Sequence, residues 1–322
     1  MRNEVGNAMK MIALGRSSLR VSQLALGCMY LGARDSKEDS FRRLDQYLDA
    51  GGNFLDTANM YSHWISEATK GGESETLLGE WFKARACRSK VVIASKVGFP
   101  YPGIPYGTGA ARIREECDKS LKRMGIDCID LYYAHSDDRG TPMEETLGAF
   151  NDLIKAGKVR HIGASNFKAW RLERAAGVCR ERGWESYCCV QQRHSFLRPK
   201  AGWDFGGQVA ANEDLLEYIK DTGLGFLAYS PLLNGAYTDT RKSFQDQYLG
   251  PDSDARLRAL AEVGSETGAT KNQVVYAWLM RADPSAIPLV ASTTDAQFAE
   301  SLGAVSLELS AAQMKTLGDA RF

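Results

Sequence analysis

The chain lacks several features that mark a membrane or nucleic-acid-binding protein. Among its 322 residues, 40 Lys and Arg balance 40 Asp and Glu, and neither sign forms a long run. A balanced chain without a run of basic residues is not typical of proteins that bind nucleic acid or an anionic membrane surface, so we expect neither partner. No apolar run approaches the roughly 20 residues that a membrane helix needs, and the polar start MRNEVGNAMK has no signal-peptide core. We therefore expect a cytoplasmic protein.

The cysteines lack the spacing of a metal or redox site. Seven are scattered along the chain, and no two form a CxxC motif. An odd, unpatterned set is typical of reduced thiols that pack mostly inside the protein. The sequence therefore predicts no metal site.

The chain does contain a regular alternation of two patterns. Apolar runs rich in β-branched residues alternate with segments of helical periodicity, which favours βα units and a parallel sheet. The expected strands are Leu24–Cys28, Asn53–Ala58, Val91–Val97, Cys128–His135, Val159–Ser165, Cys188–Gln192, Gly225–Ser230 and Ile287–Ala291. The expected helices between or after them are Glu38–Ala50, Ser74–Ala84, Ala111–Met124, Met143–Ala156, Trp170–Arg182, Asn212–Asp221 and Asp295–Leu302.

Eight strands in a chain of this length indicate closure into one barrel. We predict an α/β protein with a (β/α)8 TIM barrel, a parallel eight-stranded sheet, and a single domain over residues 1–322. Extra helices are expected at Val274–Arg281 and from Ser310 onward. Three connections that follow strands are too long for simple turns: Asn59–Gly72, Arg193–Ala211 and Asn234–Pro251. Long loops in a compact barrel commonly carry function.

Four ionisable residues lie at or just after the ends of three successive strands. Asp56 and Tyr61 follow the second strand, Lys96 ends the third, and His135 ends the fourth. In a barrel these strand ends converge on one mouth, where a carboxylate, an ammonium, a phenol and an imidazole would form a proton-transfer site. Each alone has a plainer explanation: the Asp as a helix cap, the Lys at the surface, the His in the core.

The phenol is the natural acid of this group. Free tyrosine titrates near ~10, and an adjacent cation lowers that value because it favours the phenolate. Lys96 supplies the cation, and Asp56 would keep this lysine charged and oriented. His135 would direct a carbonyl oxygen toward Tyr61 or share the proton relay.

The segments around these residues carry a resemblance to a known family. FLDTANMY, VVIASKVG, IDLYYAHSDD, VRHIGASNF and AYSPLLNG occur in this order, separated by helix-length intervals. Together they resemble the aldo-keto reductase superfamily from about Leu14 to the last helix. The resemblance implies a catalytic tetrad of Asp56, Tyr61, Lys96 and His135. It also implies hydride transfer from NADPH or NADH to a carbonyl carbon, with Tyr61 protonating the oxygen and no metal required.

The resemblance also implies a cofactor site at later strand ends. Ser165, Asn166 and Gln191 would hydrogen-bond the nicotinamide carboxamide, and Tyr229 would stack on its ring, as amide groups and a flat aromatic can. Taken alone, Tyr229 could equally be a core residue of the barrel mouth. A pyrophosphate-binding loop would include Ser230, Pro231, Leu232 and Gly235, a stretch that by itself indicates only a turn.

The segment that would bind the adenosine phosphate departs from the family pattern. Its positions are Ser292, Thr293, Gln297 and Ser301, where many NADP-preferring members place Lys or Arg. Hydroxyl groups and helix amides bind a 2′-phosphate less strongly than a guanidinium does. The preference between NADPH and NADH therefore stays open, and Arg241 or Lys242 could supply a cation from a loop.

The substrate pocket is expected around Met29, Tyr30, His63 and Trp64. Family members commonly run from the tyrosine almost directly to Gly-x-x-Glu, whereas eleven residues, Ser62–Gly72, intervene here before Glu73. This insertion is either a pocket wall or a solvated loop. Sugar-derived aldehydes, hydroxylated ketones and aromatic aldehydes are all compatible with such walls.

Three classes of function remain possible for such a chain. The first is a carbonyl-reducing enzyme acting on a small molecule, and the second is a cofactor-binding regulatory or redox-sensing subunit of the same fold. The third, an unrelated phosphate-binding barrel, is disfavoured by the intact set of Asp56, Tyr61, Lys96 and His135. That set favours the enzyme, while the sequence leaves the oligomeric state open.

Overall fold

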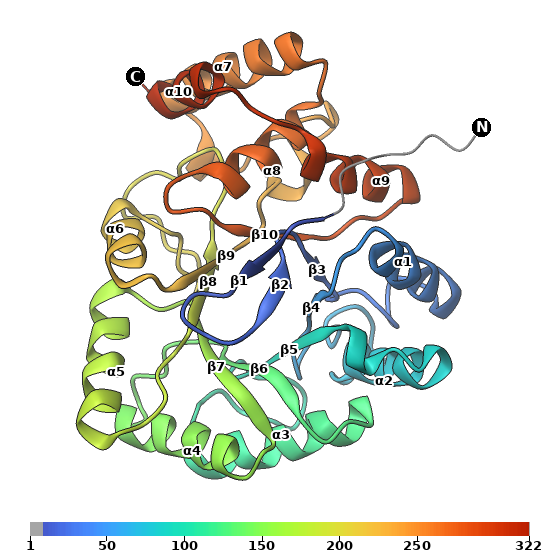
Figure 1. Cartoon of the computed structure of the whole chain (residues 1–322), viewed down its shortest axis with the longest axis vertical. Coiled ribbons are helices and arrows are strands. Elements are labelled where there is room, and N and C mark those ends of the chain that lie inside the picture. Colours follow the sequence, from blue (N-terminus) through green and yellow to red (C-terminus); the bar gives the residue numbers. More distant parts are fainter. Residues whose placement is uncertain (1–8, 322) are drawn as a thin grey trace.

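The computed structural model of the protein describes residues 9–321 and has a closed barrel of eight parallel strands at its centre (Figure 1). The barrel strands are β3 (Ala25–Gly27), β4 (Phe54–Asp56), β5 (Val92–Val97), β6 (Ile129–Ala134), β7 (Val159–Ser165), β8 (Cys189–Arg193), β9 (Gly225–Tyr229) and β10 (Ile287–Val290). Each strand pairs with the next in chain order, and β10 closes the ring by pairing with β9 and β3. The predicted (β/α)8 barrel is confirmed.

Helices surround the barrel and follow its strands (Figure 1). Those that the sequence predicted are α1 (Lys37–Asp49), α2 (Glu73–Arg85), α3 (Ala110–Met124), α4 (Met143–Lys155), α5 (Ala169–Arg182), α6 (Glu213–Thr222), α8 (Lys271–Arg281), α9 (Asp295–Gly303) and α10 (Ala311–Asp319). Single turns of 3-10 helix lie at η1 (Arg88–Lys90), η2 (Leu233–Gly235), η3 (Asp246–Tyr248) and η4 (Ala304–Ser306).

The barrel strands are buried on both faces, which explains their continuous apolar runs. Successive side chains of a strand point to opposite faces. Along β6, Leu131 and Tyr133 pack inside the barrel, whereas Tyr132 and Ala134 pack in the layer between the strands and the helices. Both layers are dry, with these four residues fully buried.

The long helix α7 (Pro251–Thr267) was not predicted from the sequence. It packs against α8 and α10 on the side of the barrel where the chain ends (Figure 1). Pro251 occupies the first helical position, where its missing N–H costs nothing. The face that α7 buries sets Leu260 and Val263 among Ala259, Gly264 and the guanidinium of Arg256, so its stripe of large apolar side chains is narrow.

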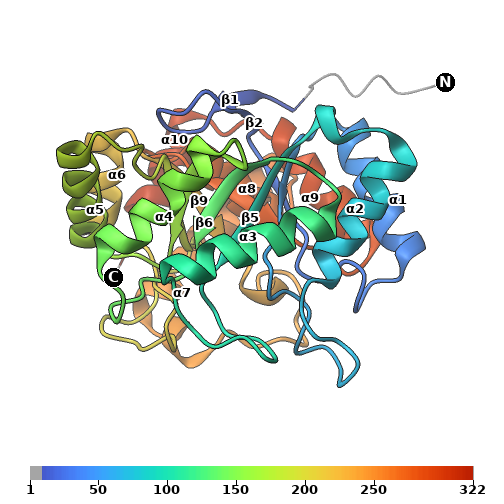
Figure 2. The same ribbon diagram turned by 90° about the horizontal axis from the view of Figure 1, so that it is seen from below.

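A two-stranded antiparallel hairpin precedes the barrel and was likewise not predicted. Its strands are β1 (Met11–Ala13) and β2 (Arg20–Ser22). Leu14 and Leu19 of its turn pack on the apolar side chains inside the barrel. Figure 2 shows the hairpin at one end of the barrel and the long connections at the other. The hairpin therefore closes the end of the barrel away from the carboxyl ends of the strands.

Within residues 9–321, we find no helix that is both long and apolar enough to span a bilayer. All seven cysteines carry free thiols, and five of them are buried.

Candidate active site

The predicted site residues come from the carboxyl ends of successive barrel strands. Asp56 ends β4, Lys96 is the penultimate residue of β5, and His135 directly follows β6. The parallel register pairs Lys96 with Tyr133 and so carries its side chain to the same end as His135. The backbone N–H of His135 donates to Val97 at 2.8 Å, which joins the ends of β5 and β6.

The ammonium of Lys96 is the centre of this group. It contacts the carboxylate of Asp56, and it donates to the carbonyl of Thr57 at 2.8 Å and to the phenol oxygen of Tyr61 at 2.9 Å. Asp56 and Lys96 are fully buried, and Tyr61 is partly exposed. The second carboxylate oxygen of Asp56 accepts a hydrogen bond of 2.8 Å from the amide of Gln191. The carboxylate is therefore held on both sides and orients Lys96.

Burial and charge act in opposite directions on these groups. Burial raises the pKa of the Tyr61 phenol above its ordinary value, and although Lys96 lowers this pKa as expected, burial has the larger effect. Burial opposes the charge on Lys96, but the carboxylate of Asp56 and the phenol raise the pKa of this lysine, so it stays protonated. Burial, with the charge of Lys96, lowers the pKa of His135 well below its ordinary value. The site thus holds a protonated phenol beside a cation and a neutral imidazole.

Aromatic rings extend outward from the phenol and the imidazole. The ring of Phe99 lies edge-on to His135 with centroids 4.7 Å apart, and Trp64 lies edge-on to Tyr61 at 6.3 Å. Tyr106 neighbours Phe99 at 6.5 Å. Trp64 and Tyr106 are 44% and 48% exposed, so the rings reach the surface. Phe99 and Tyr106 were not predicted as site residues from the sequence, although Phe99 lies only three residues after Lys96.

His63 and Trp64 of the predicted substrate pocket lie beside each other. Their rings meet edge to face with centroids 5.0 Å apart, and the imidazole Nδ1 lies 2.9 Å from the carbonyl of Met60. Trp64 reaches the Tyr61 ring, whereas His63 contacts it only through Trp64. The start of this segment therefore packs beside the phenol, whereas Ser66, Glu67, Ala68 and Lys70 are exposed to solvent.

Met29 and Tyr30 lie after β3. The hydroxyl of Ser62 donates to the carbonyl of Met29 at 2.9 Å, so this segment is tied to the residue after Tyr61. The Tyr30 ring lies under the guanidinium of Arg34, with 3.7 Å from the guanidinium carbon to the ring centroid. Tyr30 thus faces the start of α1.

The residues that the family resemblance assigns to the nicotinamide carboxamide form one hydrogen-bonded group. The hydroxyl of Ser165 donates to the carbonyl of Gln191 at 2.9 Å. The amide of Asn166 donates to the carbonyl of His135 at 2.9 Å and accepts from the Tyr229 hydroxyl at 2.7 Å. This network fixes the Tyr229 ring at the end of β9, next to the strand ends that carry the ionisable residues.

The turn at 230–235 has an unusual backbone. Ser230, Leu233, Asn234 and Gly235 all have positive φ angles, of 54°, 47°, 62° and 84°. Turns of this kind can aim backbone N–H groups into a concavity that binds an anion. The ammonium of Lys242 donates to the carbonyl of Asn234 at 2.6 Å, so a cation lies against this turn. Asp239 lies beside both cations of this loop: it pairs with the 87% exposed side chain of Arg241 at 2.9 Å and lies 3.8 Å from the ammonium of Lys242.

The predicted adenosine-phosphate residues gather at the start of α9. The backbone N–H and the hydroxyl of Thr293 both donate to the side-chain carbonyl of Gln297, at 3.0 and 2.6 Å. Thr294 caps the helix, and the hydroxyl of Ser301 donates to the backbone carbonyl of Gln297 at 2.9 Å. Ser292 is buried. Thr293 and Gln297 thus lie in contact, whereas the buried side chain of Ser292 has little surface with which to contact a ligand.

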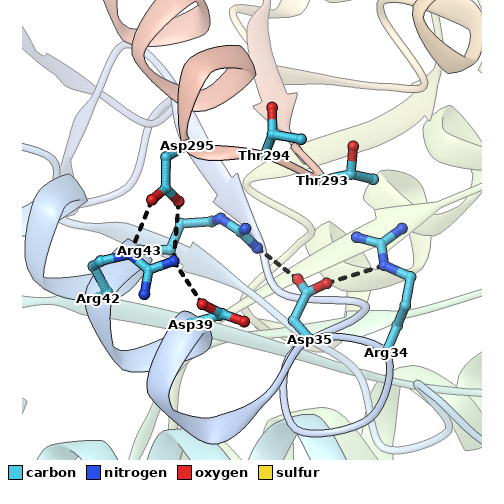
Figure 3. A pocket seen from close by; sticks show the side chains of 8 residues that line it. All are labelled: Arg34, Asp35, Asp39, Arg42, Arg43, Thr293, Thr294 and Asp295. Carbon is cyan, nitrogen blue, oxygen red and sulfur yellow. Dashed lines mark hydrogen bonds and ion pairs between the residues drawn. The ribbon is translucent and has the colours of Figure 1, made fainter.

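A pocket of about 460 Å³ opens between this turn and the start of α1 (Figure 3). Its lining residues are Arg34, Asp35, Asp39, Arg42, Arg43, Thr293, Thr294 and Asp295. The ion pairs among them are Arg34–Asp35 at 3.0 Å, Arg43–Asp35 at 2.5 Å, Arg42–Asp39 at 2.6 Å and Arg42–Asp295 at 3.0 Å. The three guanidinium groups are therefore balanced by three carboxylates. Nothing in the sequence indicated that these arginines lie at this site, because segments that meet here are far apart in the chain: Arg42 and Asp295 are separated by 253 positions.

The sequence matches the aldo/keto reductase family over residues 23–321. The chain belongs to this family. It is 32% identical to an uncharacterised oxidoreductase, YrpG, of Bacillus subtilis over 95% of this chain and 94% of the relative. It is also 31% identical to norsolorinic acid reductase B of Aspergillus parasiticus, over 85% of this chain and 74% of the relative. The chain is 30% identical to aldo-keto reductase str7 of Strobilurus tenacellus, over 92% of this chain and 84% of the relative.

Membership of the aldo/keto reductase family makes the protein an oxidoreductase that uses a nicotinamide cofactor. The family assignment leaves the choice of cofactor, the substrate and the role of each residue to be argued from the site itself.

Proposed function

We propose that the protein reduces an aldehyde or ketone to an alcohol with NADH or NADPH, and that Tyr61 is the general acid. The observation that carries the proposal is the Lys96 ammonium, which contacts Asp56 and lies 2.9 Å from the phenol oxygen of Tyr61. When bound, the reduced nicotinamide supplies the hydride that is added to the carbonyl carbon. The proton of Tyr61 goes to the carbonyl oxygen, and the phenolate regains a proton from water.

Each of the other site residues has a part in this proton transfer. Lys96 stabilises the phenolate that forms as the proton leaves, and Asp56 keeps Lys96 charged and in place. His135 is neutral, so one ring nitrogen can donate an N–H to the carbonyl oxygen. Its Nδ1 is buried without a hydrogen-bond partner among residues 9–321. If the proton of the neutral ring lies on Nε2, the unpaired Nδ1 is an acceptor. Burial of an unpaired acceptor costs less free energy than burial of an unpaired N–H donor.

The residues at the end of β7 to β9 fit a nicotinamide cofactor. Ser165 and Asn166 present hydroxyl and amide groups, the amide of Gln191 lies beside Asp56, and Tyr229 offers a fixed flat ring. The 230–235 turn, with Lys242 against it, offers backbone amides and a positive charge to a pyrophosphate.

We infer that the chain accepts both NADH and NADPH. The position where a cation would meet the 2′-phosphate holds Thr293, whose hydroxyl already donates to Gln297. Arg42 lies nearby, but it is paired with Asp39 and Asp295. The carboxylates at the pocket offset the attraction of the arginines for a phosphate, so the extra phosphate gains less than it would from an unpaired arginine.

We further propose that the substrate carries a flat apolar or aromatic group beside its carbonyl. Phe99 and Trp64 flank His135 and Tyr61 with their ring edges, and Trp64 and Tyr106 continue the wall to the surface. Such rings bind a flat partner through offset or edge contacts as well as through apolar burial. A sugar-like substrate would find few hydrogen-bonding groups on these walls.

The direct test is the oxidation of NADH and of NADPH by the purified chain in the presence of benzaldehyde, followed by the loss of reduced-nicotinamide absorbance. We expect alcohol formation in step with cofactor oxidation. A chain that binds the cofactor but reduces none of a panel of aromatic and aliphatic aldehydes and ketones would contradict the proposal and favour a regulatory role.

A further inference from the structure

Glu116 is a buried carboxylate that the proposed chemistry does not use. It lies on α3 and is 1% exposed. One of its oxygens accepts hydrogen bonds from the side-chain amide of Asn59 at 2.7 Å and from the hydroxyl of Tyr101 at 2.6 Å. Its other oxygen lies 2.9 Å from the ammonium of Lys119. Burial acts to raise the pKa of Glu116, but these three bonds outweigh it and lower that pKa, so the carboxylate stays charged.

Asn59 belongs to the connection that carries Tyr61. It lies two residues before the phenol and is 1% exposed. Its backbone N–H donates to the carbonyl of Lys96 at 3.2 Å, and its side chain reaches Glu116. Asn59 therefore joins the strand that carries Lys96 to helix α3.

Tyr101 belongs to the connection between β5 and α3, and its ring packs on the far end of the same 57–72 connection. A Cβ at Gly71 would lie 2.7 Å from this ring, and the φ of Gly71 is +93°. Both the space and the backbone thus require glycine there. Glu116 therefore holds the 57–72 connection near one end through Asn59 and near the other through Tyr101.

The phenol lies between two fixed points on this connection. Asn59 is held by Glu116 on one side, and the Ser62 hydroxyl is held by the carbonyl of Met29 on the other. We propose that Glu116 is a positioning residue that sets the contact between Tyr61 and Lys96. The proposal rests on the proposed role of Tyr61. Glu116 itself touches neither Tyr61 nor Lys96 through a hydrogen bond.

Loss of the Glu116 carboxylate would free the amide of Asn59. The carbonyl oxygen of that amide is already without a partner among the described residues, so the side chain would have nothing to hold it. The backbone next to Tyr61 could then shift, and a displacement of about 1 Å in a reacting group can cost up to about a hundredfold in rate.

The test compares Glu116→Ala with Glu116→Gln and with Lys119→Met. Glu116→Ala removes both anchors, Glu116→Gln keeps an oxygen that can accept from Asn59 and Tyr101, and Lys119→Met leaves both anchors intact. We expect Glu116→Ala to lower kcat roughly tenfold, with an unchanged Kd for NADPH. Glu116→Gln should recover most of the rate, and Lys119→Met should behave as the wild type.

A second measurement does not depend on turnover. The ionisation of Tyr61 is read as the difference in absorbance titration between each chain and the same chain carrying Tyr61→Phe. We expect Glu116→Ala to raise the pKa of Tyr61, because the phenol moves away from the charge of Lys96. Loss of the Glu116 charge alone would act in the opposite direction, and Glu116→Gln controls for it.

If Glu116→Ala does not fold, Tyr101→Phe replaces it, since this variant loses only one hydroxyl and should show a smaller change of the same sign. A folded Glu116→Ala chain with an unaltered Tyr61 pKa and an unaltered kcat would overturn the proposal. Equal losses in Glu116→Ala and Lys119→Met, without a shift of the pKa, would do the same. A wild type without reductase activity would contradict the proposed function, and the titration would still decide the role of Glu116.

Discussion

Lys96 donates one hydrogen bond to the phenol oxygen of Tyr61, at 2.9 Å, while its ammonium also contacts the carboxylate of Asp56. A protonated phenol and a protonated lysine therefore lie in direct contact in a buried site. The pair can release a proton to a substrate because Lys96 stabilises the phenolate left behind.

Tyr61→Phe should lower carbonyl reduction by at least about two orders of magnitude, the range expected for the loss of a general acid. Cofactor binding should stay near normal because the ring is kept. The measurement is kcat with a saturating aldehyde, and Tyr106→Phe at the rim of the same wall is the matched control. A folded Tyr61→Phe chain with the wild-type kcat would show that Tyr61 is not the general acid.

Lys96→Met should nearly abolish turnover and should move the pH dependence of the remaining rate. Reduction requires protonated Tyr61, so kcat/KM falls as the pH rises through the phenol pKa. Burial raises that pKa and Lys96 lowers it, so removal of the cation should shift the alkaline limb to higher pH. An alkaline limb at the same pH in both chains would show that Lys96 does not act on the phenol.

NADH and NADPH should differ in Kd by less than about a hundredfold. A charged hydrogen bond from Arg to phosphate contributes on the order of 1.5–3 kcal/mol, roughly ten- to a hundredfold in affinity, and Thr293 cannot supply it. Quenching of tryptophan fluorescence measures both constants. A preference for NADPH beyond about a thousandfold would be inconsistent with this inference and would direct attention to Lys242, Arg241 and Arg34.

Trp64→Ala should weaken the preference for aromatic over small aliphatic aldehydes. The contact of two aromatic rings contributes about 1 kcal/mol beyond burial, so the ratio of kcat/KM for benzaldehyde over propanal should fall roughly fivefold or more. Trp170→Ala on α5 is the control, because this tryptophan is similarly exposed and stacks on Arg139 and Arg171. An equal loss for both aldehydes would mean that Trp64 does not select the substrate.

Sequence reasoning located the barrel strands because strands buried on both faces are unbroken apolar runs. It located Asp56, Lys96 and His135 because a barrel brings the carboxyl ends of its strands together whatever their spacing in the chain. The strands β1 and β2 were missed because each has only three residues and mixed exposure. Helix α7 was missed because its buried face sets only two large apolar residues, Leu260 and Val263, among small and polar ones, so the usual periodicity is weak.

Interactions between distant segments were beyond that reasoning. The pairing of Arg42 with Asp295, and of Asn59 with Glu116, depends on how helices and connections of different βα units lie against one another. The start of the helix that the sequence predicted at Ser74–Ala84 shows a related effect. The helix begins one residue earlier, and the Ser74 hydroxyl donates to the carbonyl of Cys28 at 2.7 Å and pairs with Thr57.

The hairpin at the closed end of the barrel also constrains the order in which the molecule is completed. A Cβ on Gly15, in the turn between β1 and β2, would lie 2.3 Å from the carbonyl of Cys188 and 2.5 Å from the amide nitrogen of Gly225. The turn of the hairpin thus takes its final position against residues that lie some two hundred positions later in the chain. We therefore expect the hairpin to dock only after β8 and β9 have been synthesised, and the inner apolar surface that it covers to stay open to water until then.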